Sequence, residues 1–328
     1  MVKNKKTLII IIAALAVLPL IFKSDSFHNI MVLLLIYATL GEAWNIITGF
    51  AGQTSFGHAA FFGIGAYTSS VLFYKFDISP WMGMFVGAIF AAAVALIISY
   101  PTFRLKGSYF AIATLAVAEI IKQLFVSWKF VEGATGISLP IVNDSWLCME
   151  FHTTKLPYIY IALGLFAIVI FVCNYIENSK TGFYLKAIRE SHEVAESIGI
   201  NTTNYKTLAM VISAFISAFA GSLYAQYVLY IDPFMIFTLD ISIKIVLLTV
   251  LGGIGNIYGP LIGASILIPL SEITRVKLGG TGRGIDLMIF GLLVIFVACY
   301  QPKGIIGLVN KVAKKFKKEG EGNVEANS

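Results

Sequence analysis

Long apolar runs separated by short polar segments make up most of the chain. Runs of about 20 apolar residues are long enough to cross the hydrocarbon core of a bilayer as helices. Helices are expected there because they satisfy every backbone hydrogen bond internally. The pattern therefore predicts an all-α, polytopic transmembrane bundle of about ten spanning segments, within a range of eight to ten. The expected spans are 7–22, 29–48, 57–74, 81–100, 109–127, 156–175, 206–229, 240–252, 258–271 and 285–301.

Composition excludes the ordinary water-soluble classes. Hydrophobic residues make up 58% of the 328 residues and only 13% are charged, which is about half the share in a soluble domain. A chain of this size cannot bury so much apolar surface in a core of its own. The net charge of +6 does not predict nucleic-acid binding, because the basic residues lie at the ends of apolar runs instead of forming a stripe with aromatic residues.

The distribution of lysine and arginine predicts the orientation in the membrane. Basic residues concentrate before the first apolar run, in the 176–205 loop and in the C-terminal tail, and such residues prefer the cytoplasmic side. We therefore expect a multi-pass protein of the cell membrane with both termini in the cytoplasm and segment 128–155 outside. One transmembrane domain over 1–307 and a tail over 308–328 are expected. The first run is expected to be a retained helix, with a cleaved signal peptide as the alternative.

The 176–205 loop contains an amphipathic pattern over residues 183–198. Such a short helix can insert its apolar stripe into a groove of a partner protein, or it can lie on the membrane surface as a connector. Three glutamates and a thin apolar stripe favour the partner. Thr181 is the expected N-cap and Gly199 the expected left-handed residue after the helix. The candidate coupling residues are Gly182, Leu185, Ile188, Arg189, Glu190, Ala195, Ile198 and Gly199.

Two glycine-rich clusters, 49–58 and 252–263, interrupt the apolar pattern. Non-helical backbone at membrane depth is tolerated only where protein or a water-filled cavity covers it, so paired interruptions point towards a transport pathway. The alternative is that both clusters are tight turns between spans at the inner side, where they can still belong to a gate. The candidate pathway or gate residues are Asn45, Gly49, Gly52, Gln53, Ser55, Gly57, His58, Gly252, Gly253, Gly255 and Asn256.

Signatures of catalytic chemistry do not occur in the sequence. The phosphate-binding pattern G-x-x-x-x-G-K-[ST] is missing, and His192-Glu193 is followed by glutamate at position 196, where a zinc helix requires histidine. The four histidines fall in four separate regions. We therefore expect no enzyme activity, no cofactor and no metal site in this chain.

Five collinear stretches together resemble a known family. The chain is similar to the LivM-type permease of the branched-chain amino acid ABC importer family over about residues 30–300. Lys106 and Ser108 depart from the family pattern, in which arginine and aspartate are common. The stretches are TGFAGQTSFGHAAFFGIGAY (48–67), RLKGSYFAIATLAVAEI (104–120), GATGI (133–137), TGFYLKAIRESHEVAESIGINTTNYK (181–206) and LLTVLGGIGNIYGPLIGA (247–264).

The resemblance implies a permease subunit that works with several partners in the lipid membrane. These are a second, LivH-like permease, two cytoplasmic ABC ATPase subunits (LivG- and LivF-like) and an extracytoplasmic binding protein that delivers leucine, isoleucine or valine. It also implies that the 176–205 loop holds the helix that couples to an ATPase. The alternatives are a permease of the related urea and short-chain amide importers and, in another class, a self-sufficient secondary transporter or channel.

Overall fold

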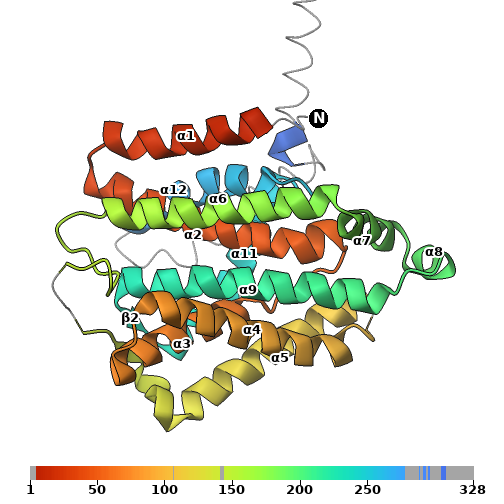
Figure 1. Cartoon of the computed structure of the whole chain (residues 1–328), viewed down its shortest axis with the longest axis horizontal. Coiled ribbons are helices and arrows are strands. Elements are labelled where there is room, and N and C mark those ends of the chain that lie inside the picture. The colour runs from red at the N-terminus through yellow and green to blue at the C-terminus, as the bar shows by residue number, and fades with distance from the viewer. Residues whose placement is uncertain are drawn as a thin grey trace, which may run out of the picture.

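The structure is a computed structural model that describes residues 5–105, 107–140, 144–277, 288, 291–292, 295 and 304–307. The expectation of an all-α bundle is confirmed (Figure 1). In this part of the chain the only named strands are β1 (Ile137–Ser138) and β2 (Tyr230–Ile231), which pair antiparallel with Ile137 opposite Ile231. The expected tail over 308–328 lies outside the described residues.

The helices follow one another with short connections. The first half contains α1 (Lys5–Ile21), α2 (Asp25–Asn45), the π-helix η1 (Ile46–Phe50), α3 (His58–Phe76), α4 (Pro80–Thr102), α5 (Ser108–Ser127) and the 3₁₀ turns η2 (Lys129–Val131) and η3 (Gly133–Thr135). The second half contains α6 (Leu156–Asn178), α7 (Lys180–Glu190), α8 (His192–Ser197), α9 (Thr202–Val228), α10 (Pro233–Ile236), α11 (Leu239–Gly252) and α12 (Gly259–Lys277).

Fewer helices than expected are long and apolar enough to cross a membrane. Among the described residues there are six such spans, fewer than the ten expected. The apolar part of α1 covers only Thr7–Ile21, and α3 and α12 are not among the six. The last expected span, 285–301, lies almost wholly outside the described residues. The six spans are Asp25–Phe50, Pro80–Thr102, Ser108–Ser127, Leu156–Asn178, Thr202–Val228 and Pro233–Gly252.

The position of α3 explains why it can carry several hydroxyl groups. Fourteen of its 19 residues are buried, and it packs against α4 and α9 in the interior of the bundle. Small residues make this close packing possible: Gly65 lies against the backbone of Ala218, where a Cβ atom has no room. The Ser222 hydroxyl of α9 also donates to the Gly65 carbonyl at 2.9 Å. A helix covered by protein on all sides can carry hydroxyl groups that a lipid-facing helix avoids.

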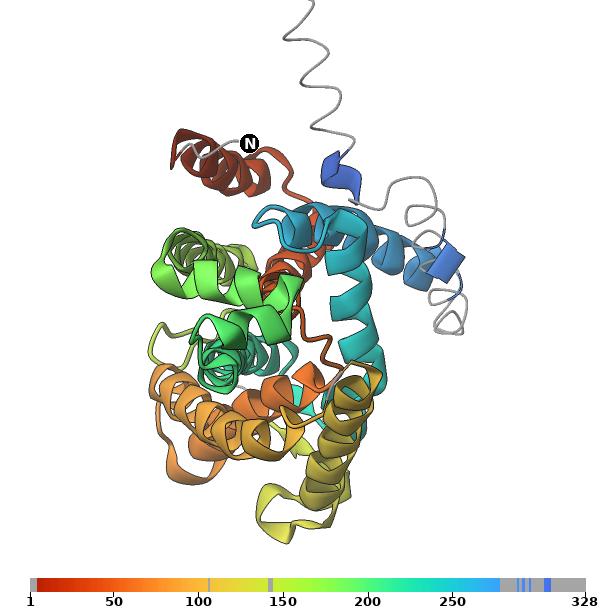
Figure 2. The same cartoon turned by 90° about the vertical axis from the view of Figure 1, so that its right-hand side faces the viewer.

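The two ends of the bundle differ in their connections. One end carries α7 and α8, the end of α2, the start of α5 and the turn between α11 and α12 (Figures 1 and 2); we call it the loop end. The opposite end carries the two strands and residues 144–155. There Asp144 accepts hydrogen bonds from the Thr153 hydroxyl at 2.6 Å and the His152 N–H at 2.7 Å, which hold the pKa of the Asp144 carboxyl below its usual range.

Candidate functional site

Both glycine-rich clusters are connectors at the loop end of the bundle. Helix α2 continues as η1, and residues 51–57 then run without regular structure to α3. Residues 253–258 form the turn between α11 and α12. The reading of these clusters as turns between helices therefore matches the structure. We call them the first connector (46–57) and the second connector (252–258). Their role in a gate stays a prediction.

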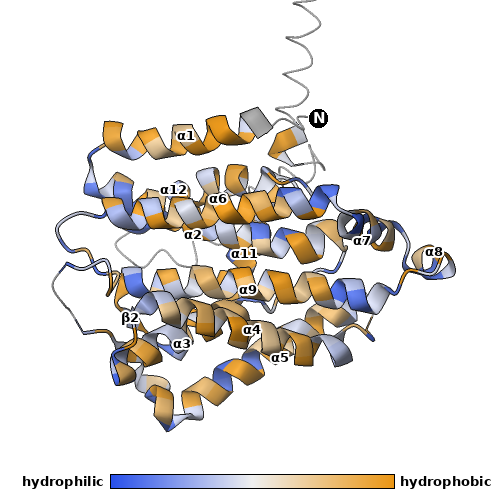
Figure 3. Ribbon diagram, viewed as in Figure 1, coloured by the Kyte–Doolittle hydropathy of each residue, from blue (hydrophilic) through white to orange (hydrophobic). Residues whose placement is uncertain are grey.

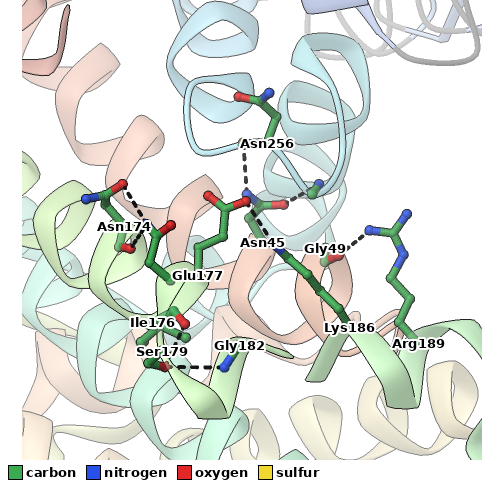
Figure 4. A network of polar contacts seen from close by, with 12 residues as sticks. Asn45, Gly49, Asn174, Ile176, Glu177, Ser179, Gly182, Lys186, Arg189 and Asn256 are labelled. Carbon is green, nitrogen blue, oxygen red and sulfur yellow. Dashed lines mark hydrogen bonds and ion pairs between the residues drawn. The ribbon is translucent and has the colours of Figure 1, made fainter. Parts of the chain in front are cut away.

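Asn45 joins the two connectors. Its side-chain Nδ2 donates to the Asn256 carbonyl at 3.1 Å, and its Oδ1 accepts from the Gly255 N–H at 2.8 Å (Figure 4). Asn45 is completely buried. Gly49 lies against the Asn45 side chain and 2.8 Å from the Gly255 nitrogen, measured from the place a Cβ atom would take, so no larger residue fits there. An asparagine suits this place because its amide both donates and accepts.

Arg189 connects helix α7 to the same network. Its Nη1 donates to the Gly49 carbonyl at 2.6 Å (Figure 4). That carbonyl lies in the last turn of η1, where helices leave carbonyl groups without partners inside the helix and where a positive charge is favoured. Gly52 and Gly255, with φ of +72° and +76°, both approach Arg189 closely. This bond lies within the chain, while Arg189 itself remains exposed, and its role as a coupling residue stays a prediction.

The start of α7 is fixed to the end of α6. The Ser179 hydroxyl accepts from the Gly182 N–H at 3.3 Å, so Ser179 is the N-cap in place of the expected Thr181. Lys186 forms an ion pair with Glu177 at 2.9 Å. Gly182 lies against the carbonyl groups of Ile176 and Glu177, with no room for a Cβ atom. The helix is thus held at its first turn as well as through Arg189 (Figure 4).

The expected single helix over 183–198 is divided into two. Ser191 is extended, with φ of −158° and ψ of 117°, and its hydroxyl caps α8 by accepting from the Val194 N–H at 3.4 Å. Serine favours such caps because its side chain competes with the helix for backbone hydrogen bonds. Gly199 has φ of +85°, which confirms the left-handed residue expected there. Helix α9 is capped by Asn201, not by Thr202 or Thr203.

The apolar stripe of this segment mostly faces the protein itself. Leu185, Ile188 and Ala195 are buried within the chain, with 1%, 4% and 1% of their surface exposed. The expectation that these three side chains are free to enter a partner's groove is therefore wrong. The apolar side chains on the outer surface are instead those of Phe183, Val194 and Ile198, each at least 60% exposed. These three residues and the exposed Glu190 form what we call the outer face of α7–α8.

A pocket of about 320 Å³ opens at the loop end beside Arg189. Gln53 of the first connector lines it, together with Gly107 at the start of α5 and Lys206 of α9. Gln53 is thus a candidate gate residue that lines this pocket. The pocket places the first connector, α7 and α5 around one volume.

Other candidate residues are used for packing inside the bundle. Ser55 is buried, and its carbonyl accepts from the Trp44 indole at 2.7 Å. His58 is buried with its Nε2 2.7 Å from the Ser213 hydroxyl, which itself donates to the Ala43 carbonyl at 2.6 Å. Ser213 therefore accepts from the histidine, which fixes Nε2 as the protonated nitrogen. Gly57 lies against Thr114 of α5, 2.9 Å from its carbonyl oxygen at the place of a Cβ atom.

The remaining candidates separate into two groups. Gly252 and Gly253 pack against Gly259 and Gly304, away from Arg189. Ala195, Ile198 and Gly199 lie on α8 or just after it.

The Glu177–Lys186 pair and the Ser213 hydroxyl were not predicted from the sequence, because their partners lie on other helices and no spacing along the chain links them. Ser179 follows the rule that serine precedes a helix, which is the signal that identifies it.

The chain matches the family described as branched-chain amino acid transport system, permease component, over residues 26–298. It is 26% identical to the high-affinity branched-chain amino acid transport system permease protein LivM of Escherichia coli K12, over 95% of this chain and 77% of the relative. It is 28% identical to the LivH protein of Salmonella typhimurium, over 83% of this chain and 91% of the relative. It is 25% identical to BraD of Pseudomonas aeruginosa over the same shares.

No solved structure matches the chain significantly. The family match covers most of the chain, including both connectors and helices α7 and α8. The named relatives are permease components of transport systems, and six described helices are long and apolar enough to cross a membrane. The chain is therefore a multi-pass membrane protein that belongs to the permease-component family of branched-chain amino acid transport systems.

Proposed function

We propose that this chain is the permease subunit of an ATP-driven importer for leucine, isoleucine and valine. In this proposal it pairs with a second, LivH-like permease. Two cytoplasmic ATPase subunits (LivG- and LivF-like) supply the energy, and an extracytoplasmic binding protein delivers the amino acid. The substrate follows from the names of the relatives, which are all branched-chain amino acid permease proteins. The chain then works in the cell membrane with both termini and the 176–205 loop in the cytoplasm.

One observation carries the mechanical part of this proposal: a single arginine links the loop helix α7 to the first connector and touches the second. Arg189 donates to Gly49 at 2.6 Å and lies against Gly255. Asn45 then ties the two connectors to each other. A displacement of α7 by an ATPase thus reaches the end of α2 and the turn between α11 and α12 through hydrogen bonds.

The anchoring of α7 makes it suited to transmit such a displacement. It is fixed to α6 by the Lys186–Glu177 pair and the Ser179 cap, and its buried side chains Leu185 and Ile188 pack against the bundle. A helix that is held at several points moves as a rigid body and displaces the segments bonded to it. A loosely attached connector would change its own conformation instead. The break at Ser191 leaves α8 as a separate short unit that projects from the bundle (Figure 1).

The outer face of α7–α8 is the proposed docking surface for an ATPase subunit. Phe183, Val194 and Ile198 expose large apolar side chains at the loop end, where an aqueous cytoplasm makes such exposure unfavourable. Burying one side chain of this size contributes about 1.5–3 kcal/mol before ordering costs. Glu190 beside them favours a basic counterpart on the partner.

Reconstitution tests the proposal directly. The chain is placed in proteoliposomes with its second permease and both ATPases, and the binding protein is loaded with radiolabelled leucine. ATP-dependent uptake of leucine that is competed by isoleucine and valine, and that stops when the ATPases are left out, supports the proposal. Uptake that persists without the ATPases identifies a secondary transporter or channel. Uptake of urea or short-chain amides without uptake of leucine identifies the related importer class.

A further inference from the structure

The outward face of α5 differs in chemistry from the outward faces of the other peripheral spans. Among the six described spans, α5 has the smallest share of its apolar window buried inside this chain, at 28%. Its inward stripe is buried and runs through Phe110, Thr114, Ala118, Ile121 and Phe125. Its outward stripe is exposed and runs through Ile112, Leu115, Glu119, Ile120, Gln123 and Leu124.

Three polar side chains form a cluster on this outward side, which we call the α5 triad: Glu119, Lys122 and Gln123. The Lys122 Nζ lies 3.1 Å from one carboxylate oxygen of Glu119, and the Gln123 amide donates to the same oxygen at 2.9 Å. Half of the Glu119 side chain, 52%, is exposed, while that of Lys122 is 19% exposed. Lys122 also lies 5.8 Å from the centre of the Phe234 ring, which holds the ammonium on this side of the helix.

One member of the α5 triad, Glu119, lies near the middle of the span, and Lys122 and Gln123 lie about one turn nearer its C-terminal end. Glu119 is the twelfth of the 20 residues of α5, so it lies about 17 Å along a helix of about 30 Å. Long charged side chains at helix ends reach water by extending towards it, but this position is too deep for Glu119 to do so. Ionisable groups inside a bilayer face a bundle interior or a water-filled cavity and mark functional pathways.

Helices α4 and α6 are apolar along most of their length (Figure 3). Helix α4 contains no charged residue, and it exposes Ile89 and Ile97. Helix α6 exposes Ile168 and Phe171, and its one charged residue, Glu177, lies at its end. Glu119 and Lys122 form an ion pair, but removing both charged groups from water still costs free energy. The pair therefore does not behave like an apolar surface. Contact of this part of the α5 face with lipid chains is therefore unfavourable.

We propose that the outward face of α5 forms a wall of the translocation route and contacts the transported amino acid directly. This inference rests on the proposed function and names the residues that contact its substrate. The Glu119 carboxylate accepts hydrogen bonds from the ammonium group of the substrate, and the Lys122 ammonium donates to its carboxylate. Leu115, Ile120 and Leu124 beside the triad provide aliphatic surface for a branched apolar side chain. The outward face of α5 thus offers a partner for the ammonium group, the carboxylate and the aliphatic side chain of the amino acid.

Cysteine labelling in the assembled transporter tests whether water reaches the outward face of α5. In a background that lacks the native cysteines, I120C on α5 is compared with I168C on the outward face of α6, because both residues lie near the middle of their helices and are 60% and 64% exposed. We expect a cationic, membrane-impermeant thiol reagent to modify I120C at least tenfold faster than I168C, and saturating leucine with binding protein to slow that reaction several-fold. A rate for I120C equal to that of I168C, or a rate that leucine leaves unchanged, overturns the proposal.

Substitution of the carboxylate tests the contact with the ammonium group. E119Q keeps the size of the side chain and removes its charge. The matched control is E272Q, because Glu272 on α12 forms a similar pair with Arg275 at 2.7 Å. We expect E119Q to raise the KM for leucine uptake by about tenfold, the effect of losing one charge-assisted hydrogen bond, and E272Q to leave KM unchanged. An unchanged KM in E119Q, in a complex that still retains its ATPase subunits, overturns the proposed contact.

Failure of the proposed function and failure of the proposed role of α5 give different results. If the chain does not import branched-chain amino acids, the unsubstituted complex shows no uptake of leucine. If only the role of α5 is wrong, the unsubstituted complex imports leucine, but I120C behaves like I168C and E119Q keeps the normal KM.

Discussion

Asn45 and Gly255 are 210 positions apart in the chain, yet the Gly255 N–H donates a hydrogen bond to the Asn45 side chain at 2.8 Å. This bond joins the end of α2 to the turn between α11 and α12. Arg189 of α7 reaches the same place through the Gly49 carbonyl. The end of α2, the turn between α11 and α12, and α7 are far apart in the sequence. They meet at one end of the bundle through these contacts.

Removing the Asn45 amide is expected to loosen both connectors. Asn45→Leu keeps a similar volume but leaves the Gly255 N–H and the Asn256 carbonyl without their partner. An unsatisfied buried polar group costs about 1–3 kcal/mol. We expect a lower thermal midpoint in detergent and reduced uptake by the reconstituted complex. Asn45→Asp is expected to be at least as destabilising, because it places a carboxylate in a completely buried site facing the Asn256 carbonyl; equal stability of all three proteins contradicts this role.

A side chain at Gly255 is expected to disturb the Arg189 contact. Gly255 has φ of +76°, and a Cβ atom there would lie 2.6 Å from Nη1 of Arg189. Gly255→Ala therefore combines backbone strain with a displaced guanidinium. The matched control is Gly164→Ala in α6, where a Cβ atom meets nothing within 4 Å. We expect uptake to fall in the first variant and to stay normal in the second, measured at equal expression; similar uptake in both argues against a tight fit.

Arg189 is expected to be needed for coupling. Arg189→Ala removes the bond to Gly49 and leaves the outer face of α7–α8 intact. We expect the ATPase subunits to co-purify with this variant, while the ratio of leucine transported to ATP hydrolysed falls several-fold. Lys180→Ala, a change of another exposed basic residue on the same helix, serves as the control and should keep the normal ratio. A normal ratio in Arg189→Ala means that another contact transmits the movement.

The outer and inner faces of α7–α8 are expected to respond differently to a new charge. Val194→Asp places a carboxylate on the exposed surface, where Val194 is 60% exposed, whereas Ile188 is only 4% exposed. We expect Val194→Asp to weaken ATPase co-purification while the permease keeps its thermal midpoint. Ile188→Asp should lower that midpoint itself, because an unpaired buried carboxylate costs several kcal/mol. Normal ATPase binding by Val194→Asp places the docking surface elsewhere.

The orientation of the protein is testable with single cysteines at the two ends of the bundle. Ser197 at the end of α8 and Thr154 before α6 are both exposed. We expect S197C to react with an impermeant thiol reagent only after the cells are opened, and T154C to react in intact cells, because the basic residues favour a cytoplasmic 176–205 loop. Reaction of S197C in intact cells reverses the predicted topology.

The sequence by itself determined the class of the protein and the positions of most helices. Apolar runs of about 20 residues permit few structures other than spanning helices, so the predicted spans fall on α1–α6, α9, α11 and α12. Local chemistry also sufficed for Gly199, where a glycine follows a helix and adopts a positive φ. The number of spans was predicted less well, because three of the predicted runs fall on α1, α3 and α12, which are not among the six described helices that are long and apolar enough to cross a membrane.

Only the tertiary structure decided which way the polar and apolar side chains face. The periodicity of 183–198 identified Leu185 and Ile188 as one stripe, but periodicity does not say whether a stripe packs on its own bundle or on a partner; burial shows that it packs on its own bundle. In the same way nothing in the sequence indicated that the exposed Arg189 donates to the Gly49 carbonyl. Both depend on contacts between segments far apart in sequence, and spacing along one segment carries no information about such contacts.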